Sequence, residues 1–249
     1  WNYINCQTRH TIAHELGHNL GLMHAGAGGA EYGDGSAIMG SSDANSLVNI
    51  NTAQRYMRGW VPRAGVRDLG DLSATSGPHT VTIADSALSP DGSHGATVVM
   101  FRPGAYGGSS KKCTNGDGVD LPFCHASDMG GSVVISFRAG HSGFDRNLRS
   151  EFKNKVTVHQ LVGKVGSHHL GDIVSNDWTD PWSHTATATV TILPRSWLLK
   201  GGVLQEGDIY QGGSHVAQEV PTQQHGKDIQ WCDGCDAQLD YVVQVCSIG

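Results

Sequence analysis

The stretch His14-Glu15-Leu16-Gly17-His18-Asn19-Leu20-Gly21-Leu22-Met23-His24 sets the architecture and the chemistry expected of this chain. It follows the pattern HExxHxxGxxH. Because His14 and His18 are four residues apart, an α-helix places them on one face, about 40° apart around its axis. Two imidazoles at this spacing can bind one zinc ion together. The stretch therefore predicts a helix that carries a zinc site.

The other polar and special positions of the stretch complete that site. Glu15 lies about 100° around the helix from His14, so its carboxylate would stand beside the metal and act as general base on a water. Gly21 falls where the helix must end, since glycine readily adopts the left-handed conformation that turns the chain there. That turn would bring His24 back as third ligand. A chance occurrence on an ordinary helix is a more plausible explanation for HExxH alone than for the full motif.

The opposite side of the predicted helix is apolar. Ile12, Leu16 and Leu20 are spaced i, i+4 and i+8, which places them on one stripe. We expect this stripe to be buried against a sheet or core, with the ligands facing a cleft.

HExxHxxGxxH is the zinc signature of the metzincin proteases, and residues 8–60 resemble one metzincin family, the gametolysins, which are secreted cell-wall lytic enzymes of green algae. The similarity continues through the run Asn49-Ile50-Asn51-Thr52-Ala53-Gln54-Arg55-Tyr56-Met57-Arg58-Gly59-Trp60, which looks like the family's helix after the Met-turn. Less specific similarity follows in residues 134–138, 143–145 and 154–159.

The resemblance implies a zinc endopeptidase of the extracellular matrix that acts on hydroxyproline-rich glycoproteins. It implies His14, His18 and His24 as ligands of one Zn²⁺ and Glu15 as base. Metzincins place a Met-turn beneath the zinc, and the loop Glu31–Gly40 supplies Met39 as an apolar floor that does not bind the metal. Astacin-like relatives carry a tyrosine ligand two residues after that methionine; the position here is serine, so we expect three protein ligands plus solvent.

A metzincin domain has a substantial segment before its zinc helix, whereas only thirteen residues precede His14 here. That segment would supply the sheet that covers the apolar stripe and an edge strand along which substrate pairs. Either the chain is a fragment, or another polypeptide supplies the missing half. We favour the second, because the apolar helix face would otherwise be exposed.

Composition excludes several classes of partner. The net charge is −6 and the lysines and arginines do not cluster, which argues against nucleic acid and anionic membranes. No apolar run approaches the roughly 18 residues of a membrane span. The expected partner is a protein or glycoprotein substrate of the extracellular matrix.

Six cysteines fit three disulfides in an oxidising compartment and allow fifteen pairings. Cys113 and Cys124, which bracket a Gly/Asn/Asp loop, are the favoured pair. We therefore expect an extracellular protein, secreted to a cell wall or matrix. The stretch Asn115–Asp120 inside that loop has the oxygen-rich composition of a calcium loop, but it lacks a bidentate glutamate at position twelve, and a turn held by the disulfide explains it equally well. Ca²⁺ stays an open alternative.

After Pro62 the helical periodicity stops and short β-branched runs follow. We predict an α+β fold, β-rich overall: residues 1–62 as the C-terminal half of a metzincin catalytic domain, and 63–249 as an antiparallel β-sandwich or jelly-roll-like module. The predicted strands are Val81 to Ile83, Ala96 to Phe101, Ser132 to Arg138, Lys155 to Val162, Thr185 to Leu193 and Leu239 to Val245.

Two rival functions stay open. The chain could be a non-catalytic structural or adhesive component of an extracellular assembly that retains a metzincin frame. It could also be a β-sandwich lectin with an incidental zinc helix, whose glycan binding would survive metal removal. Against the first rival stands Glu15, which a retired site would be free to lose.

Overall fold

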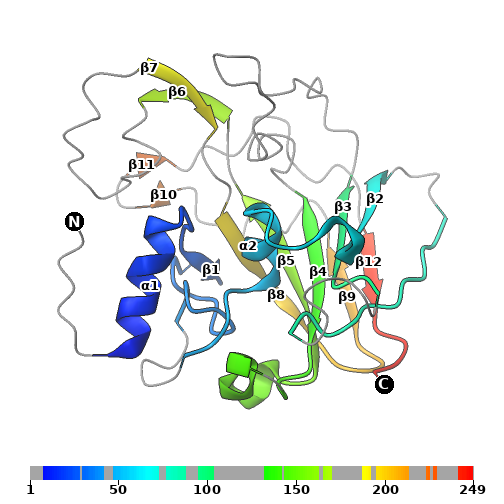
Figure 1. Ribbon diagram of the computed structural model, residues 1–249. Coiled ribbons are helices and arrows are strands. Elements are labelled where there is room, and N and C mark those ends of the chain that lie inside the picture. Colours follow the sequence, from blue (N-terminus) through cyan, green and yellow to red (C-terminus); the bar gives the residue numbers. More distant parts are fainter. Residues whose placement is uncertain are drawn as a thin grey trace.

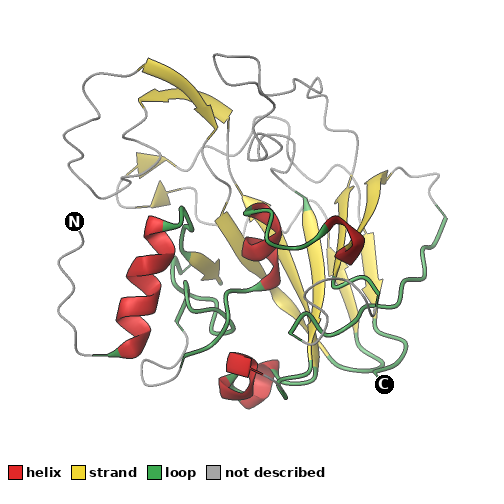
Figure 2. Ribbon diagram, in the orientation of Figure 1, coloured by secondary structure: helices red, strands yellow, loops and turns green. Residues whose placement is uncertain are grey.

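A computed structural model describes residues 8–28, 30–41, 47–72, 77–87, 95–103, 132–141, 143–162, 165–169, 187–191, 195–212, 223–224, 227–228 and 241–248. These residues form an α+β structure that is rich in β-strand, with two α-helices (Figure 2). No helix in this part of the chain is long and apolar enough to cross a membrane.

Six strands form one mixed sheet in the order β1-β8-β5-β4-β3-β2 (Figure 1). Their bounds are β1 Ala25–Ala27, β2 Val66–Leu72, β3 Val98–Pro103, β4 Val133–Arg138, β5 Lys155–Val162 and β8 Arg195–Leu204. The edge strands β1 and β2 run parallel to their neighbours, and the three inner pairings are antiparallel. The expectation of a purely antiparallel module is therefore wrong for this sheet. The connection from β2 to β3 is long enough for the crossover that parallel strands need.

Three further two-stranded antiparallel sheets accompany the main one. They pair β6 with β7, β9 with β12 and β10 with β11. Their bounds are β6 Val165–His169, β7 Thr187–Thr191, β9 Ile209–Gly212, β10 Gln223–Gln224, β11 Lys227–Asp228 and β12 Tyr241–Gln244.

Most strands predicted from β-branched runs are confirmed. The run from residue 155 to 162 coincides with β5, and four other predicted runs overlap β3, β4, β7 and β12. The prediction of a strand from Val81 to Ile83 is wrong, because only Ile83 pairs there, in an isolated bridge to Ala96. A strand needs several consecutive paired residues, and this segment has one.

Alternation along the strands gives the main sheet two apolar faces. On β3, Val99 and Phe101 belong to a core that includes Tyr210 of β9. Val98 and Met100 belong to the opposite core, with residues of helix α2, Thr52–Met57. The β9–β12 pair thus packs on one face and α2 on the other. Whether the chain forms a complete β-sandwich or jelly roll stays a prediction, as does the metzincin frame.

The predicted zinc-site segment and the predicted β-module share the main sheet. β1 comes from residues 25–27 and pairs with β8, whose Ser196, Trp197 and Leu198 lie opposite it. The division between residues 62 and 63 as a domain boundary stays a prediction. What the sheet does establish is that the segment after the zinc motif is fixed by hydrogen bonds to residues far along the chain.

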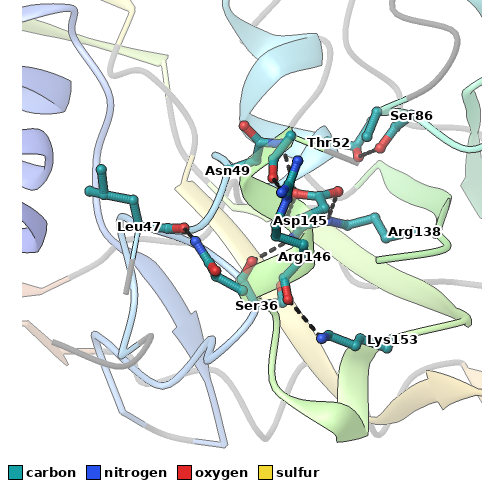
Figure 3. Close-up of polar contacts among 12 residues, drawn as sticks. Ser36, Leu47, Asn49, Thr52, Ser86, Arg138, Asp145, Arg146 and Lys153 are labelled. Atoms are coloured by element: carbon teal, nitrogen blue, oxygen red, sulfur yellow. Dashed lines mark hydrogen bonds and ion pairs between the residues drawn. The ribbon is translucent and has the colours of Figure 1, made fainter. Parts of the chain in front are cut away.

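A buried ion pair ties a loop of the N-terminal segment to the sheet (Figure 3). Arg138 on β4 donates to Asp145 through Nη2 at 2.5 Å and Nε at 2.9 Å, and the two side chains are 2% and 1% exposed. Arg138 also donates to the carbonyl of Ser36 at 2.5 Å, and Asn49 donates to Asp145 at 2.7 Å. Asp145 lies in the 3-10 helix η2, Gly143–Asn147.

We predict that Asp145→Ala destabilises the fold by about 3–5 kcal/mol, because it leaves the Arg138 guanidinium buried and unpaired. Urea unfolding with linear extrapolation measures the change. The control is Glu151→Ala, which removes an exposed partner 3.7 Å from Arg149 and should cost about 1 kcal/mol or less. Equal losses in the two variants would contradict the role given to the buried pair.

Candidate metal centre

The zinc motif lies on helix α1, Arg9–Asn19, as predicted. Thr8 begins the helix: it has extended backbone angles, and its hydroxyl accepts a hydrogen bond from the Thr11 amide at 3.2 Å, which satisfies one of the free donors of the first turn. The helix ends one residue after His18. Gly21 follows with φ +76°, the left-handed conformation predicted for it. The chain then turns back so that His24 directly precedes β1.

The rings of His14 and His18 are each fixed by a backbone carbonyl. Nδ1 of His14 bonds to the carbonyl of Ile38 at 2.9 Å, and Nδ1 of His18 bonds to the carbonyl of Leu22 at 2.8 Å. A carbonyl oxygen can only accept, so both Nδ1 atoms carry the hydrogen. Each ring therefore has its Nε2 lone pair available for a metal.

His24 is fixed by side chains of the loop that follows it. Its Nδ1 contacts the carboxylate of Glu31, which makes Nδ1 the donor and leaves Nε2 on the side of His18. The ring of Tyr32 lies over the same imidazole, with centroids 4.0 Å apart, and 5.8 Å from the centroid of His14. Two consecutive residues thus hold this ring.

The three histidines converge on one point. Nε2 of His24 is 3.0 Å from Nε2 of His18, and one nitrogen of each of the three histidines, His14 included, lies within 4.8 Å of the others. A cation bound by both nitrogens would remove the repulsion between two lone pairs at this distance. The donor set therefore fits a metal ion, and three imidazoles are a ligand set that zinc accepts.

Burial keeps one ligand neutral. Burial lowers the pKa of His14 from 6.5 to about 4; the hydrogen bond to the Ile38 carbonyl opposes this, and the neighbouring His18 and His24 add to it. At neutral pH the His14 ring is therefore uncharged and keeps its Nε2 lone pair, as a metal ligand must.

Met39 lies against the helix beneath the histidines. It is fully buried, and a Cβ built on Gly17 would lie 2.4 Å from its sulfur. Gly17 is one turn after His14 and next to His18, so the methionine packs where the two ligands leave the helix. Glu15 lies between them in sequence and is half-buried. The catalytic and supporting roles of these residues stay predictions.

A buried carboxylate anchors the loop that carries Met39. Asp34 accepts hydrogen bonds from the Ser36 amide at 2.8 Å, from Nδ2 of Asn51 at 2.8 Å and from Nε2 of His159 on β5 at 3.1 Å. Asn51 also donates to Ser196 of β8 at 2.9 Å. The loop is thus bonded to two strands of the main sheet.

The profile of the family described as gametolysin peptidase M11 matches residues 2–176. The chain belongs to this family. It is 26% identical over 255 aligned residues to the protein named autolysin of Chlamydomonas reinhardtii, an alignment that covers 96% of the chain. The chain spans 38% of the length of that relative. No solved structure gives a significant match.

Glu31 and Tyr32 of this gametolysin-family chain were not predicted as site residues from the sequence. Both stand in the loop that was singled out for Met39, seven and eight residues after His24. The available signal was an acidic residue next to an aromatic one in the loop that follows a predicted ligand. Spacing along a loop, unlike spacing on a helix, does not fix which side chains meet.

The apolar stripe of α1 is largely exposed in the part of the chain that the structure describes. Leu16 and Leu20 are 51% and 52% exposed, and Ile12 is half-buried. Within the described residues of this gametolysin-family chain both leucines are thus largely exposed, and their burial against a sheet stays a prediction. A covering polypeptide stays a prediction.

Other expected sites lie outside the described residues. They are Cys113, Cys124 and the possible calcium stretch from residue 115 to 120. Among the described residues, Cys246 is exposed and forms no disulfide. The predicted disulfides stay untested.

We predict that Asp34 makes stability depend on pH below pH 5. Burial alone would raise its pKa, but hydrogen bonds from His159, Ser36 and Asn51 and the charge of His159 lower it from 3.8 to about 2. Because the folded pKa lies below the unfolded one, the stabilisation is present above pH 3.8 and is lost as the pH falls towards 2.

The test is urea unfolding of the metal-free protein between about pH 5 and pH 2. Asp34→Asn should be less stable than the unmutated chain at the upper end, and the difference should shrink as the pH falls. Asp68→Asn, at a carboxylate whose side chain is 48% exposed, is the matched control. A difference between the unmutated chain and Asp34→Asn that stays constant with pH would contradict the prediction.

Proposed function

We propose that this chain is a secreted zinc-dependent endopeptidase that hydrolyses peptide bonds of extracellular-matrix or cell-wall glycoproteins. The observation that carries the proposal is the convergence of three imidazole nitrogens whose opposite ring nitrogens all donate to fixed acceptors. Such a set is preorganised, as a catalytic zinc site requires. Membership of a peptidase family supports the same chemistry.

His14, His18 and His24 would hold the ion. When bound, zinc supplies a Lewis acid that polarises a peptide carbonyl and lowers the pKa of a water molecule. The three histidines contribute no charge of their own, so the full charge of the ion acts on the reacting groups. The gametolysin-like motif keeps its first histidine, which makes zinc the first choice of metal.

Glu15 would act as general base and then as general acid. It follows His14 directly on α1 and is half-buried, so its carboxylate belongs to the same end of the site without being part of the ligand set. It accepts one proton from the attacking water and delivers one to the nitrogen of the departing amine. The water oxygen would bond to the carbonyl carbon as the C–N bond breaks, so the products are a carboxyl group and an amine, and no covalent enzyme intermediate forms.

Gly21 and Met39 would support this geometry rather than take part in it. Gly21 turns the chain so that His24 reaches the other two ligands. Met39 fills the space beneath the helix with a polarisable apolar side chain. Ser41 occupies the position two residues after the methionine, so three protein ligands leave a position for solvent.

The proposed substrate and location are based on similarity to a relative. The relative from Chlamydomonas reinhardtii is named autolysin, a name that fits a lytic enzyme of a cell wall. We extend to this chain a protein or glycoprotein substrate outside the cell, and a further polypeptide that covers the exposed Leu16 and Leu20.

We predict that Glu15→Ala lowers peptidase activity by about 10²-fold or more, because the proton transfers lose their carboxylate. Bound zinc should stay near one per chain, since Glu15 is not a ligand. His18→Ala should instead lose the metal. Casein cleavage measures activity, and atomic absorption measures metal content.

Glu206→Ala is the control for Glu15→Ala. This exposed glutamate accepts one bond from the Ile248 amide at 3.1 Å, and its loss should leave cleavage unchanged. Full activity in the zinc-loaded Glu15→Ala protein would contradict the mechanism. Gelatin zymography with and without a chelator tests the rival function, because a structural or adhesive protein clears neither lane.

A further inference from the structure

We propose that Glu31 is a positioning residue that orients His24 and strengthens its bond to the metal, so that this ligand acts as part of a carboxylate–histidine–metal arrangement. The inference rests on the proposed zinc site. Glu31 itself is not a ligand, because it contacts the far nitrogen of the ring.

The three ligands differ in how they are held. His14 and His18 stand on α1, and each donates to a backbone carbonyl, an acceptor that no substitution removes. His24 follows the helix, so no helical turn restricts its ring. Its acceptor is a side chain with a full negative charge, and a charge-assisted hydrogen bond is roughly twice as strong as a neutral one.

The contact between Glu31 and His24 is built into the fold of the loop. The two side chains are 14% and 6% exposed, so little water competes for the pair. The loop folds back on β1 through the bond from the Asp34 amide to the Ala25 carbonyl at 3.2 Å. Gly33 makes this possible, since a Cβ there would lie 2.2 Å from the Ala27 carbonyl oxygen. A residue with a side chain at 33 would push Glu31 away.

The chemical effect follows from the acceptor. A carboxylate at Nδ1 fixes the tautomer that leaves Nε2 without hydrogen, and it draws the Nδ1 proton towards itself, which raises the basicity of Nε2. The Tyr32 ring against the same imidazole limits its rotation. Loss of such an outer partner typically weakens metal binding 10- to 100-fold.

The experiment measures zinc affinity of the full chain by competition with a chromogenic chelator. Glu31→Ala should weaken Zn²⁺ binding about 10- to 100-fold. Glu31→Gln should restore part of the loss, because an amide oxygen accepts the same Nδ1–H without the charge. Glu206→Ala, which also removes an accepting carboxylate, should bind zinc as the unmutated chain does.

A second readout uses Co²⁺ in place of zinc. If Glu31 orients His24, the visible absorption of the Co²⁺ protein changes in Glu31→Ala and returns towards the original in Glu31→Gln. Unchanged zinc affinity in Glu31→Ala would overturn the inference. Should that variant not fold, judged by thermal unfolding without metal, unchanged affinity in Glu31→Gln would overturn it.

These outcomes separate the inference from the proposed function. If the unmutated chain binds zinc but has no peptidase activity, the proposed function is wrong. The zinc affinities of the Glu31 variants would still test the role of Glu31. Absence of zinc binding in the unmutated chain would overturn both.

Discussion

Everything at the centre of this molecule depends on three imidazoles that converge on one point. Nε2 of His18 and Nε2 of His24 are 3.0 Å apart, and a cation between two such nitrogens would remove the repulsion of their lone pairs. The arrangement persists because each opposite ring nitrogen donates to an acceptor fixed elsewhere, at Leu22, Ile38 or Glu31. The rest of the fold can be understood as the means of fixing those three acceptors.

The main sheet fixes them through buried polar contacts rather than apolar packing alone. Two of the acceptors lie in the loop between β1 and α2, and that loop is bonded to His159 through Asp34 and to Arg138 through the Ser36 carbonyl. Burying such groups is unfavourable unless they are hydrogen-bonded, so the loop has few alternative positions. Matching of the gametolysin family profile across residues 2–176, well beyond the motif, agrees with a site that needs strands from later in the chain.

The sequence predicts what depends on local periodicity and misses what depends on distant contacts. Helix α1, the left-handed turn at Gly21 and strand β5 follow from spacing, from glycine and from a β-branched run. Strand β1 has the sequence Ala-Gly-Ala, which does not predict a strand. Its central residue must be small because the ring of Trp197 covers Gly26, where a Cβ would lie 2.1 Å from that ring. The contact of Glu31 with His24 also depends on distant contacts, because the loop folds back on β1 and no local sequence pattern predicts that fold.

The HExxHxxGxxH stretch and the turn that carries Met39 are coupled by a residue that the motif leaves undefined. HExxHxxGxxH permits any residue at position 17, yet Met39 approaches so closely there that only glycine fits without displacing a fully buried side chain. The same turn supplies the Ile38 carbonyl that holds His14 and the Met39 carbonyl that accepts from the Ala25 amide at 2.8 Å. A larger residue at 17 would therefore move the methionine, and with it the carbonyl that accepts from His14 and the start of β1. Helix and turn in this chain form a single unit, because close packing at one glycine fixes the position of both relative to the three histidines.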